Sequence, residues 1–247
     1  MSFKSWKSYW AFSDKILNQS RFIYGDEETD FIDTVLKTCE DKIENIGKGR
    51  DFWRAQIGCD IYIDEEYVER KYPYAPERFF PKKEFAKEGR VNPKGIAYIY
   101  LATDSQTSIN ECRPWVGMDL SVGVLRTTKE LKVIDCSVNH ASNPLFFDVN
   151  KGFYEPSDVD KEEAVWAHIG RALSRPVNPT DTQADYVPTQ ILAEAFKYHG
   201  YDGVVYKSML GPGRNLALFD LDNVELHERG LFEVESVEIM ANSIRHL

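Results

Sequence analysis

The sequence of 247 residues has no long apolar run: no segment approaches the roughly 18 consecutive apolar residues that a membrane-spanning helix needs. It also has no excess of positive charge, because 40 acidic residues outnumber 30 lysines and arginines and give a formal net charge of −10. Nonspecific nucleic-acid binding needs a cationic surface, so this balance argues against it but leaves room for a local basic pocket for a small anion. The first residues lack the apolar stretch of a signal peptide. We therefore expect a cytoplasmic protein with no membrane partner and no direct binding of nucleic acid.

Cysteines and histidines are few and widely spaced. The four cysteines (Cys39, Cys59, Cys112 and Cys136) match no metal-binding or redox spacing, and the five histidines are isolated from one another. The motifs of serine hydrolases, zinc peptidases and phosphate-loop proteins are absent from the sequence. The segment Gly211–Arg214 could wrap a phosphate, but two glycines and a proline more often form only a turn. We therefore expect four reduced structural thiols, histidines in structural or surface positions, and no metal.

Apolar periodicity predicts four helices. Residues spaced three and four apart predict a helix over Asp26–Ile46 that stops at Gly47, and residues 1–50 are expected to form an N-terminal helical extension. The other predicted helices run from about Ser105 to Arg113, from Glu162 to Leu173 with Ser157 as a cap, and from about Pro188 to Gly200.

Short runs of β-branched and aromatic residues predict the strands Phe52–Ile57, Ala97–Ala102, Leu131–Asp135, Gly203–Lys207 and Asn215–Phe219. The segment from Asp60 to Glu88 has the composition of loops, and the alternating tail Phe232–Met240 is typical of an edge strand. Strands and helices follow one another without regular βαβ alternation, which favours an α+β fold.

Residues that could bind a ligand or take part in catalysis are concentrated between Gly89 and Glu111. Arg90 lies in a turn, where a guanidinium can donate two hydrogen bonds to a phosphate or carboxylate. Tyr100 follows in a strand and can offer a flat face to a heteroaromatic ring. Glu111, on the next helix, can accept hydrogen bonds from ribose hydroxyls and stabilise positive charge at an anomeric carbon. Each residue also has an ordinary interpretation, as a loop charge, a half-buried strand residue and a solvated helix residue.

The order of several sequence blocks resembles the RES domain family, named for its Arg, Glu and Ser residues. The blocks are Trp53–Ala55, Gly89–Gly95, Tyr100–Ala102, Glu111, Tyr186–Gln190, Gly200–Gly203, Val205–Ser208 and Asn215–Phe219. The resemblance covers about residues 52–219, and we expect the whole domain to occupy residues 51–247. One departure is Val91, which stands where the family usually has an aromatic residue.

The resemblance implies an ADP-ribosyltransferase-like mixed α/β domain whose split β-sheets surround a cleft for NAD. It implies that Arg90 binds the NAD phosphates, that Tyr100 stacks on nicotinamide, and that Glu111 holds the nicotinamide ribose and stabilises an oxocarbenium-like transition state. The further NAD-binding residues that it implies are Arg54, Ser208 and Asn215. Members of the family include toxins of toxin–antitoxin pairs, so an antitoxin protein is an expected partner.

Three activities fit this resemblance. The first is an NAD glycohydrolase or phosphorylase that acts as a toxin by depleting NAD; the second is a protein ADP-ribosyltransferase; the third is a non-catalytic NAD-binding or regulatory module. The sequence does not distinguish water, phosphate and a protein as the acceptor. Nicotinamide leaves NAD as a neutral molecule, so positioning and electrostatics suffice for bond cleavage and no metal or Ser/His/Asp set is expected.

Overall fold

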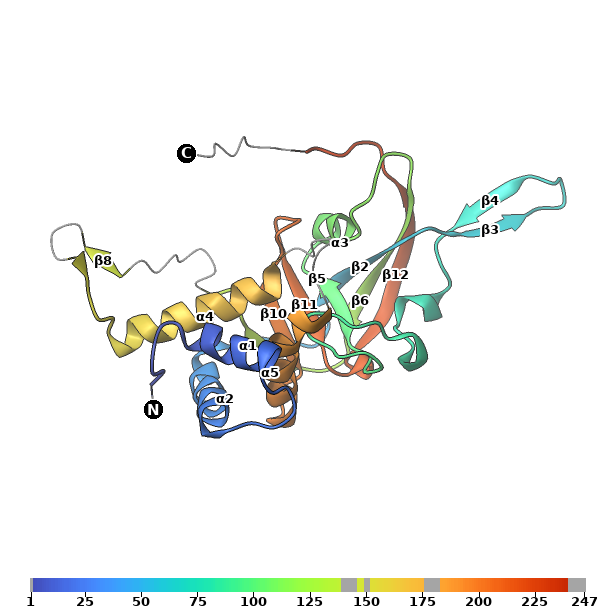
Figure 1. Cartoon of the computed structure of the whole chain (residues 1–247). Coiled ribbons are helices and arrows are strands. Elements are labelled where there is room, and N and C mark those ends of the chain that lie inside the picture. Colours follow the sequence, from blue (N-terminus) through green and yellow to red (C-terminus); the bar gives the residue numbers. More distant parts are fainter. Residues whose placement is uncertain (1, 139–145, 149–151, 176–182, 240–247) are drawn as a thin grey trace.

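A mixed sheet of eight strands forms the centre of the protein (Figure 1). The computed structural model describes residues 2–138, 146–148, 152–175 and 183–239. In spatial order the strands are β1 (Ile43–Ile46), β7 (Leu131–Asp135), β10 (Gly203–Lys207), β11 (Arg214–Leu218), β5 (Ile99–Ala102), β2 (Asp51–Ile57), β6 (Asp119–Thr127) and β12 (Val224–Glu233). Neighbouring strands are antiparallel except β7 and β10, which run parallel. The α+β prediction is confirmed.

The sheet narrows between β5 and β2. These strands share a single residue pair, Trp53 with Ala102, whereas β2 pairs with β6 along its whole length from Asp51 to Ile57. The sheet therefore divides into a wing of β1-β7-β10-β11-β5 and a wing of β2-β6-β12, as expected for split sheets. Arg54 crosses the junction, where its Nη1 donates to the Tyr100 carbonyl oxygen at 3.0 Å.

Four helices gather beside the first wing (Figure 1). They are α1 (Ser8–Asn18), α2 (Asp26–Thr38), α4 (Asp158–Ser174) and α5 (Val187–Tyr198). Helix α4 begins with a capping box between Ser157 and Asp160, which confirms the predicted cap. Its apolar face is fully buried around Trp166, whose indole N–H donates to Thr38 Oγ1 of α2 at 3.0 Å. No helix in the described ranges is long and apolar enough to cross a membrane.

The shorter elements complete the described chain. They are α3 (Ser105–Glu111), the two-residue strands β8 (Phe147–Asp148) and β9 (Gly152–Phe153), and the 3₁₀ turns Cys39–Lys42, Pro76–Phe79, Lys83–Phe85, Gln183–Tyr186 and Leu221–Asn223. All four cysteine thiols are free, and Cys39 and Cys136 are buried. Burial raises the pKa of both buried thiols, so they remain protonated.

The helix predicted over Asp26–Ile46 is too long. It ends at Thr38, and Ile43–Ile46 forms the edge strand β1, in register with β7 from Ile134 to Leu131. Periodicity alone cannot detect this strand, because pairing with a distant segment satisfies its backbone and buries Ile46. The N-terminal region therefore contributes two helices and a strand of the main sheet, and the domain division at residue 50 stays a prediction.

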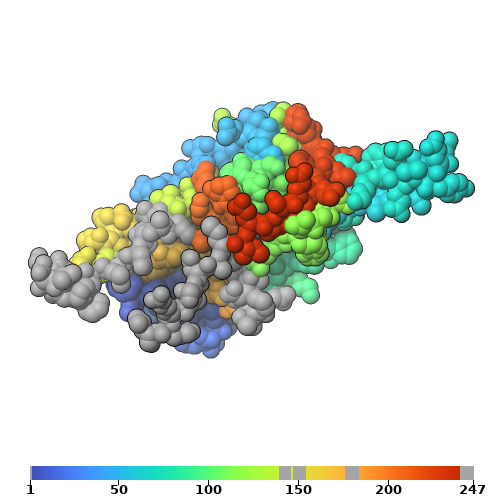
Figure 2. Space-filling model, turned by 90° about the horizontal axis from the view of Figure 1, so that it is seen from above, coloured from blue at the N-terminus to red at the C-terminus, as the bar shows by residue number. Residues whose placement is uncertain are grey.

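Two other segments differ from expectation. The predicted loop from Asp60 to Glu88 contains a hairpin of β3 (Asp60–Ile63) and β4 (Glu69–Tyr72), which projects from the body of the protein (Figures 1 and 2). The predicted edge strand Phe232–Met240 lies too far along the chain. The edge strand is β12, which ends at Glu233, and Met240 falls outside the described residues.

Candidate functional site

Glu111 is the last residue of α3 and is fixed from two strands. Its Oε1 accepts hydrogen bonds from Ser208 Oγ and from Asn215 Nδ2, both at 2.7 Å. Ser208 directly follows β10, and Asn215 lies in the neighbouring strand β11. Both donors are buried, whereas Glu111 is exposed. Because one oxygen takes both bonds, Oε2 has no hydrogen bond from the described residues and remains able to face a ligand.

The helix that carries Glu111 is itself well anchored. Asp104 caps its N-terminus, with Oδ1 accepting from the Thr107 N–H at 2.7 Å and Oδ2 accepting from Thr107 Oγ1 at 2.8 Å. The Asn110 amide donates to the Leu210 carbonyl oxygen at 2.7 Å, which ties α3 to the turn after β10. These contacts set the position of the carboxylate before any ligand binds.

Arg90 is held in a turn with part of its guanidinium unused. Nη1 donates to the Ala172 carbonyl oxygen of α4 at 3.0 Å, and the guanidinium carbon lies 5.2 Å from the centroid of the Tyr186 ring. Thr189 Oγ1 donates to the Arg90 carbonyl oxygen at 2.6 Å, which fixes the backbone. Nη2 is buried and has no hydrogen-bond partner within the described parts of the chain. An unpaired cationic N–H is costly, so this group is suited to receive an anion.

Tyr100 supports the loop that carries Arg90. Its hydroxyl donates to Asn92 Oδ1 at 2.6 Å and accepts from the Val91 N–H at 3.2 Å. Burial raises the pKa of Tyr100, so the hydroxyl stays neutral and can keep both bonds. The loop passes so close that a Cβ at Gly89 would lie 2.6 Å from the tyrosine oxygen, which requires glycine there. The hydroxyl is thus structural, while the ring lines a cavity beside Glu111.

Tyr100→Phe separates these two functions. The ring remains, but the Val91 N–H and the Asn92 side-chain oxygen each lose a partner in a part-buried loop. We expect a loss of about 1–3 kcal/mol in the free energy of unfolding and a fall in melting temperature of several degrees. Thermal melting measures it, with Tyr72→Phe on the exposed hairpin as the control. A Tyr100→Phe protein as stable as wild type would contradict the anchoring role.

Arg54 has a mainly structural position. Besides the bond to Tyr100 across the sheet junction, its Nε is buried without a partner among the described residues. Burial lowers the pKa of this guanidinium, which nevertheless stays far above neutral pH. Arg54 therefore holds the two wings together and presents a positive charge to a cavity that Glu111 also lines.

Two cavities flank Glu111 and share three lining residues, Glu111, Tyr206 and Asn215. The first has a volume of about 290 Å³ and a cationic wall formed by Arg90, Arg113 and Arg175. The second has a volume of about 210 Å³ and is lined by Arg54, Tyr100 and Cys112 among others. Of the predicted site residues, Arg54, Arg90, Tyr100, Glu111 and Asn215 line these cavities. Ser208 lines neither cavity, and its link to them is the hydrogen bond that it donates to Glu111.

Sequence reasoning missed several residues that line these two cavities, among them Tyr206, Arg113 and Arg175. Tyr206 is buried in β10 opposite Asn215 and lies within a block that carries the family resemblance, but a tyrosine in an apolar strand has the pattern of a core residue. Arg113 and Arg175 each follow the end of a helix, and no local motif distinguishes them from surface charges. Folding alone brings them to one cavity wall.

The turn Gly211–Arg214 has a structural role. Arg214 forms a bidentate ion pair with Glu44 at 2.6 and 3.0 Å and a second pair with Asp135 at 3.0 Å. Gly211 packs against Thr107, where a Cβ would come within 2.6 Å of the threonine Oγ1. The ion pairs with Glu44 and Asp135 therefore already neutralise the charge of Arg214.

Across the described residues, no group of three or more His, Cys, Asp and Glu side chains could hold a metal ion.

Comparison with known proteins identifies the family. The sequence matches none of the curated proteins. Among solved structures, a chain of the M. tuberculosis MbcT–MbcA toxin–antitoxin complex aligns with a TM-score of 0.39 and 14% identity, over 81% of this chain and 92% of that one. The family described as RES domain matches residues 65–231, which is more than half of the sequence. The protein therefore belongs to the RES domain family.

Proposed function

We propose that this protein is an enzyme that cleaves the nicotinamide–ribose bond of NAD, as a glycohydrolase or phosphorylase, and that it acts as a toxin by depleting NAD. The proposal rests on the family and on one observation above all: the Glu111 carboxylate is fixed by Ser208 and Asn215 through one oxygen, at the boundary of two cavities. A fixed, negatively charged oxygen at this point is what a reaction through a cationic ribose requires.

The two cavities suit different parts of NAD. The cavity with Arg90, Arg113 and Arg175 has the charge to hold the diphosphate. The cavity beside Tyr100 and Arg54 takes the nicotinamide, with the tyrosine ring as one wall. The ribose that joins them then lies at Glu111, which lines both. Together the cavities fall within the size range of about 300–1,000 Å³ typical of ligand sites.

The chemical step follows from this placement. The C–N bond to nicotinamide breaks, its electron pair stays on the ring nitrogen, and nicotinamide leaves as a neutral molecule. The ribose C1′ gains oxocarbenium character, which the Glu111 carboxylate stabilises. An oxygen of water or phosphate then forms the new bond to C1′, giving ADP-ribose or its 1′-phosphate, and water loses a proton in the process. The fixed hydrogen bonds to Glu111 mean that little reorganisation is needed during the reaction.

The proposal includes a cytoplasmic location, where NAD is available, and an antitoxin protein as partner, as the family resemblance implies. The acceptor is what the decisive experiment must identify. Purified protein, shown by gel electrophoresis to carry no second chain, is incubated with NAD in the presence and absence of phosphate, and the products are identified by mass spectrometry.

Release of nicotinamide with free ADP-ribose indicates a glycohydrolase, and a phosphorylated ADP-ribose that appears only with phosphate indicates a phosphorylase. ADP-ribose attached to the protein or to an added extract would favour the transferase alternative. A protein that binds NAD and releases no nicotinamide would contradict the enzymatic proposal and favour a binding module.

A further inference from the structure

A third cavity continues the cleft beyond the arginine-lined one. It has a volume of about 430 Å³ and shares Arg175 and Met209 with that cavity. Its other walls come from two helices, with Tyr9 and Trp10 on α1 and with His168, Arg171 and Ala172 on α4. The cleft therefore has three compartments in a row, and Glu111 lies between the first two.

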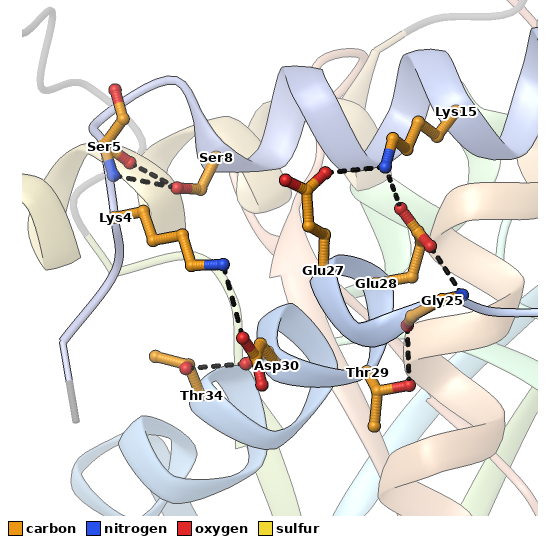
Figure 3. Close-up of polar contacts among 10 residues, drawn as sticks. All are labelled: Lys4, Ser5, Ser8, Lys15, Gly25, Glu27, Glu28, Thr29, Asp30 and Thr34. Carbon is orange, nitrogen blue, oxygen red and sulfur yellow. Dashed lines mark hydrogen bonds and ion pairs between the residues drawn. The ribbon is translucent and has the colours of Figure 1, made fainter.

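One wall of this cavity comes from outside the family match, because α1 precedes residue 65. The helix is firmly attached to the rest of the protein. Its buried Phe12 stacks on Phe31 of α2, with ring centroids 4.6 Å apart. Lys15 pairs with Glu27 at 2.6 Å and with Glu28 at 2.8 Å (Figure 3). The position of Trp10 is consequently set before any ligand binds.

Aromatic and heteroaromatic groups face this cavity. The Trp10 and His168 rings lie 4.3 Å apart between centroids and tilt by 33°. Trp10 is 48% exposed, so a large part of its indole surface is open to a ligand. His168 is 4% exposed, and its Nδ1 is buried with no hydrogen-bond partner among the described residues. Burial, followed by the charge of Arg171, lowers the pKa of His168 to about 4, so the ring is neutral near pH 7.

These features together define a ligand class. An open indole surface binds flat aromatic rings. The other ring nitrogen of the neutral His168 bonds to the Trp6 backbone, so Nδ1 can accept one hydrogen bond. Arg171 and Arg175 add positive charge to this cavity, and Arg175 also lines the diphosphate cavity. A purine that carries a phosphate satisfies all of these groups at once.

We propose that this third cavity binds the adenosine half of NAD, with adenine against Trp10 and His168, so that α1 gives the enzyme its preference for dinucleotides. The inference rests on the proposed NAD-cleaving function. It also gives the N-terminal helix a role beyond packing, since α1 supplies a wall of the substrate site that the matched part of the family lacks.

The test compares NAD with nicotinamide mononucleotide, which contains the same scissile bond and no adenosine. Wild type should prefer NAD in kcat/KM. Trp10→Ala should reduce this preference by about 5- to 150-fold, the range for loss of one base-stacking aromatic, and the change should appear in the KM for NAD. Trp115→Ala, which removes an exposed tryptophan that lines none of the three cavities, should keep the wild-type preference.

A binding measurement separates this inference from the proposed function. AMP titrated into wild type by calorimetry should bind, Trp10→Ala should weaken that binding by a similar factor, and Trp115→Ala should not. If wild type cleaves neither substrate, the proposed function fails while AMP binding still tests the cavity. If NAD is cleaved but Trp10→Ala leaves the preference and AMP binding unchanged, the adenosine site is wrong and the function stands. Trp10→Leu, which keeps an apolar side chain on the helix, replaces Trp10→Ala if thermal melting shows that the latter does not fold.

Discussion

Glu111→Gln is expected to lower kcat for NAD cleavage by about 10²–10³-fold or more, with little change in KM or melting temperature. The amide keeps the shape of the side chain and an oxygen that can accept from Ser208 and Asn215 as Oε1 does. What it removes is the negative charge, which matters most as positive charge develops on the ribose. An interaction that is stronger in the transition state than in the ground state appears in kcat.

Steady-state kinetics and thermal melting should be measured on the same preparations. Glu130→Gln, at an exposed position in the turn between β6 and β7, is the matched control and should behave as wild type. If Glu111 were only a solvated helix residue, its substitution would change stability by less than about 0.5 kcal/mol and leave turnover intact. A folded Glu111→Gln protein with wild-type kcat would therefore refute the catalytic assignment. In cells, an NAD-depleting wild type should arrest growth at an expression level at which the variant is tolerated.

The part of the site that the sequence predicts consists of residues in locally ordered blocks. Glu111, Ser208 and Asn215 each lie at or near the end of a short element, and folding brings Ser208 Oγ and Asn215 Nδ2 each to 2.7 Å from Glu111 Oε1. The order of their sequence blocks resembles the RES domain family, and this resemblance names them together. Their hydrogen bonding through a single carboxylate oxygen is a property of the packed strands and could not be derived from spacing.

The residues that the sequence did not predict depend on distant contacts. Trp10 and His168 are neighbours only because α1 packs on α4, and neither helix carries a motif for nucleotide binding. The edge strand Ile43–Ile46 has helical periodicity and becomes a strand because β7 offers it a free edge. Apolar periodicity therefore predicts whether a segment is helix or strand where burial within the segment determines its secondary structure. It fails where pairing with a segment remote in sequence determines the secondary structure.

Arg90→Lys is expected to weaken NAD binding by about ten- to over a hundredfold although the charge is kept. The guanidinium makes several contacts at once: Nη1 donates to the Ala172 carbonyl oxygen, the plane lies near the Tyr186 ring, and Nη2 is left for a ligand. An ammonium is a compact charge without this planar fork, so it cannot keep the wall contacts and also reach a phosphate. Binding is measured by calorimetry in the Glu111→Gln background, so that NAD is not consumed during the titration.

A matched control lies outside the cleft. Arg78 also lies over a tyrosine, with its guanidinium carbon 3.5 Å from the centroid of the Tyr74 ring, and it lines neither cavity beside Glu111. Arg78→Lys therefore removes the same kind of arginine–aromatic contact without touching the site, and NAD affinity should stay at the level of the background protein. Equal losses in both variants would indicate a general effect on folding. Unchanged affinity in Arg90→Lys would mean that Arg90 does not contact the dinucleotide, and the diphosphate would then have to bind elsewhere in the cleft.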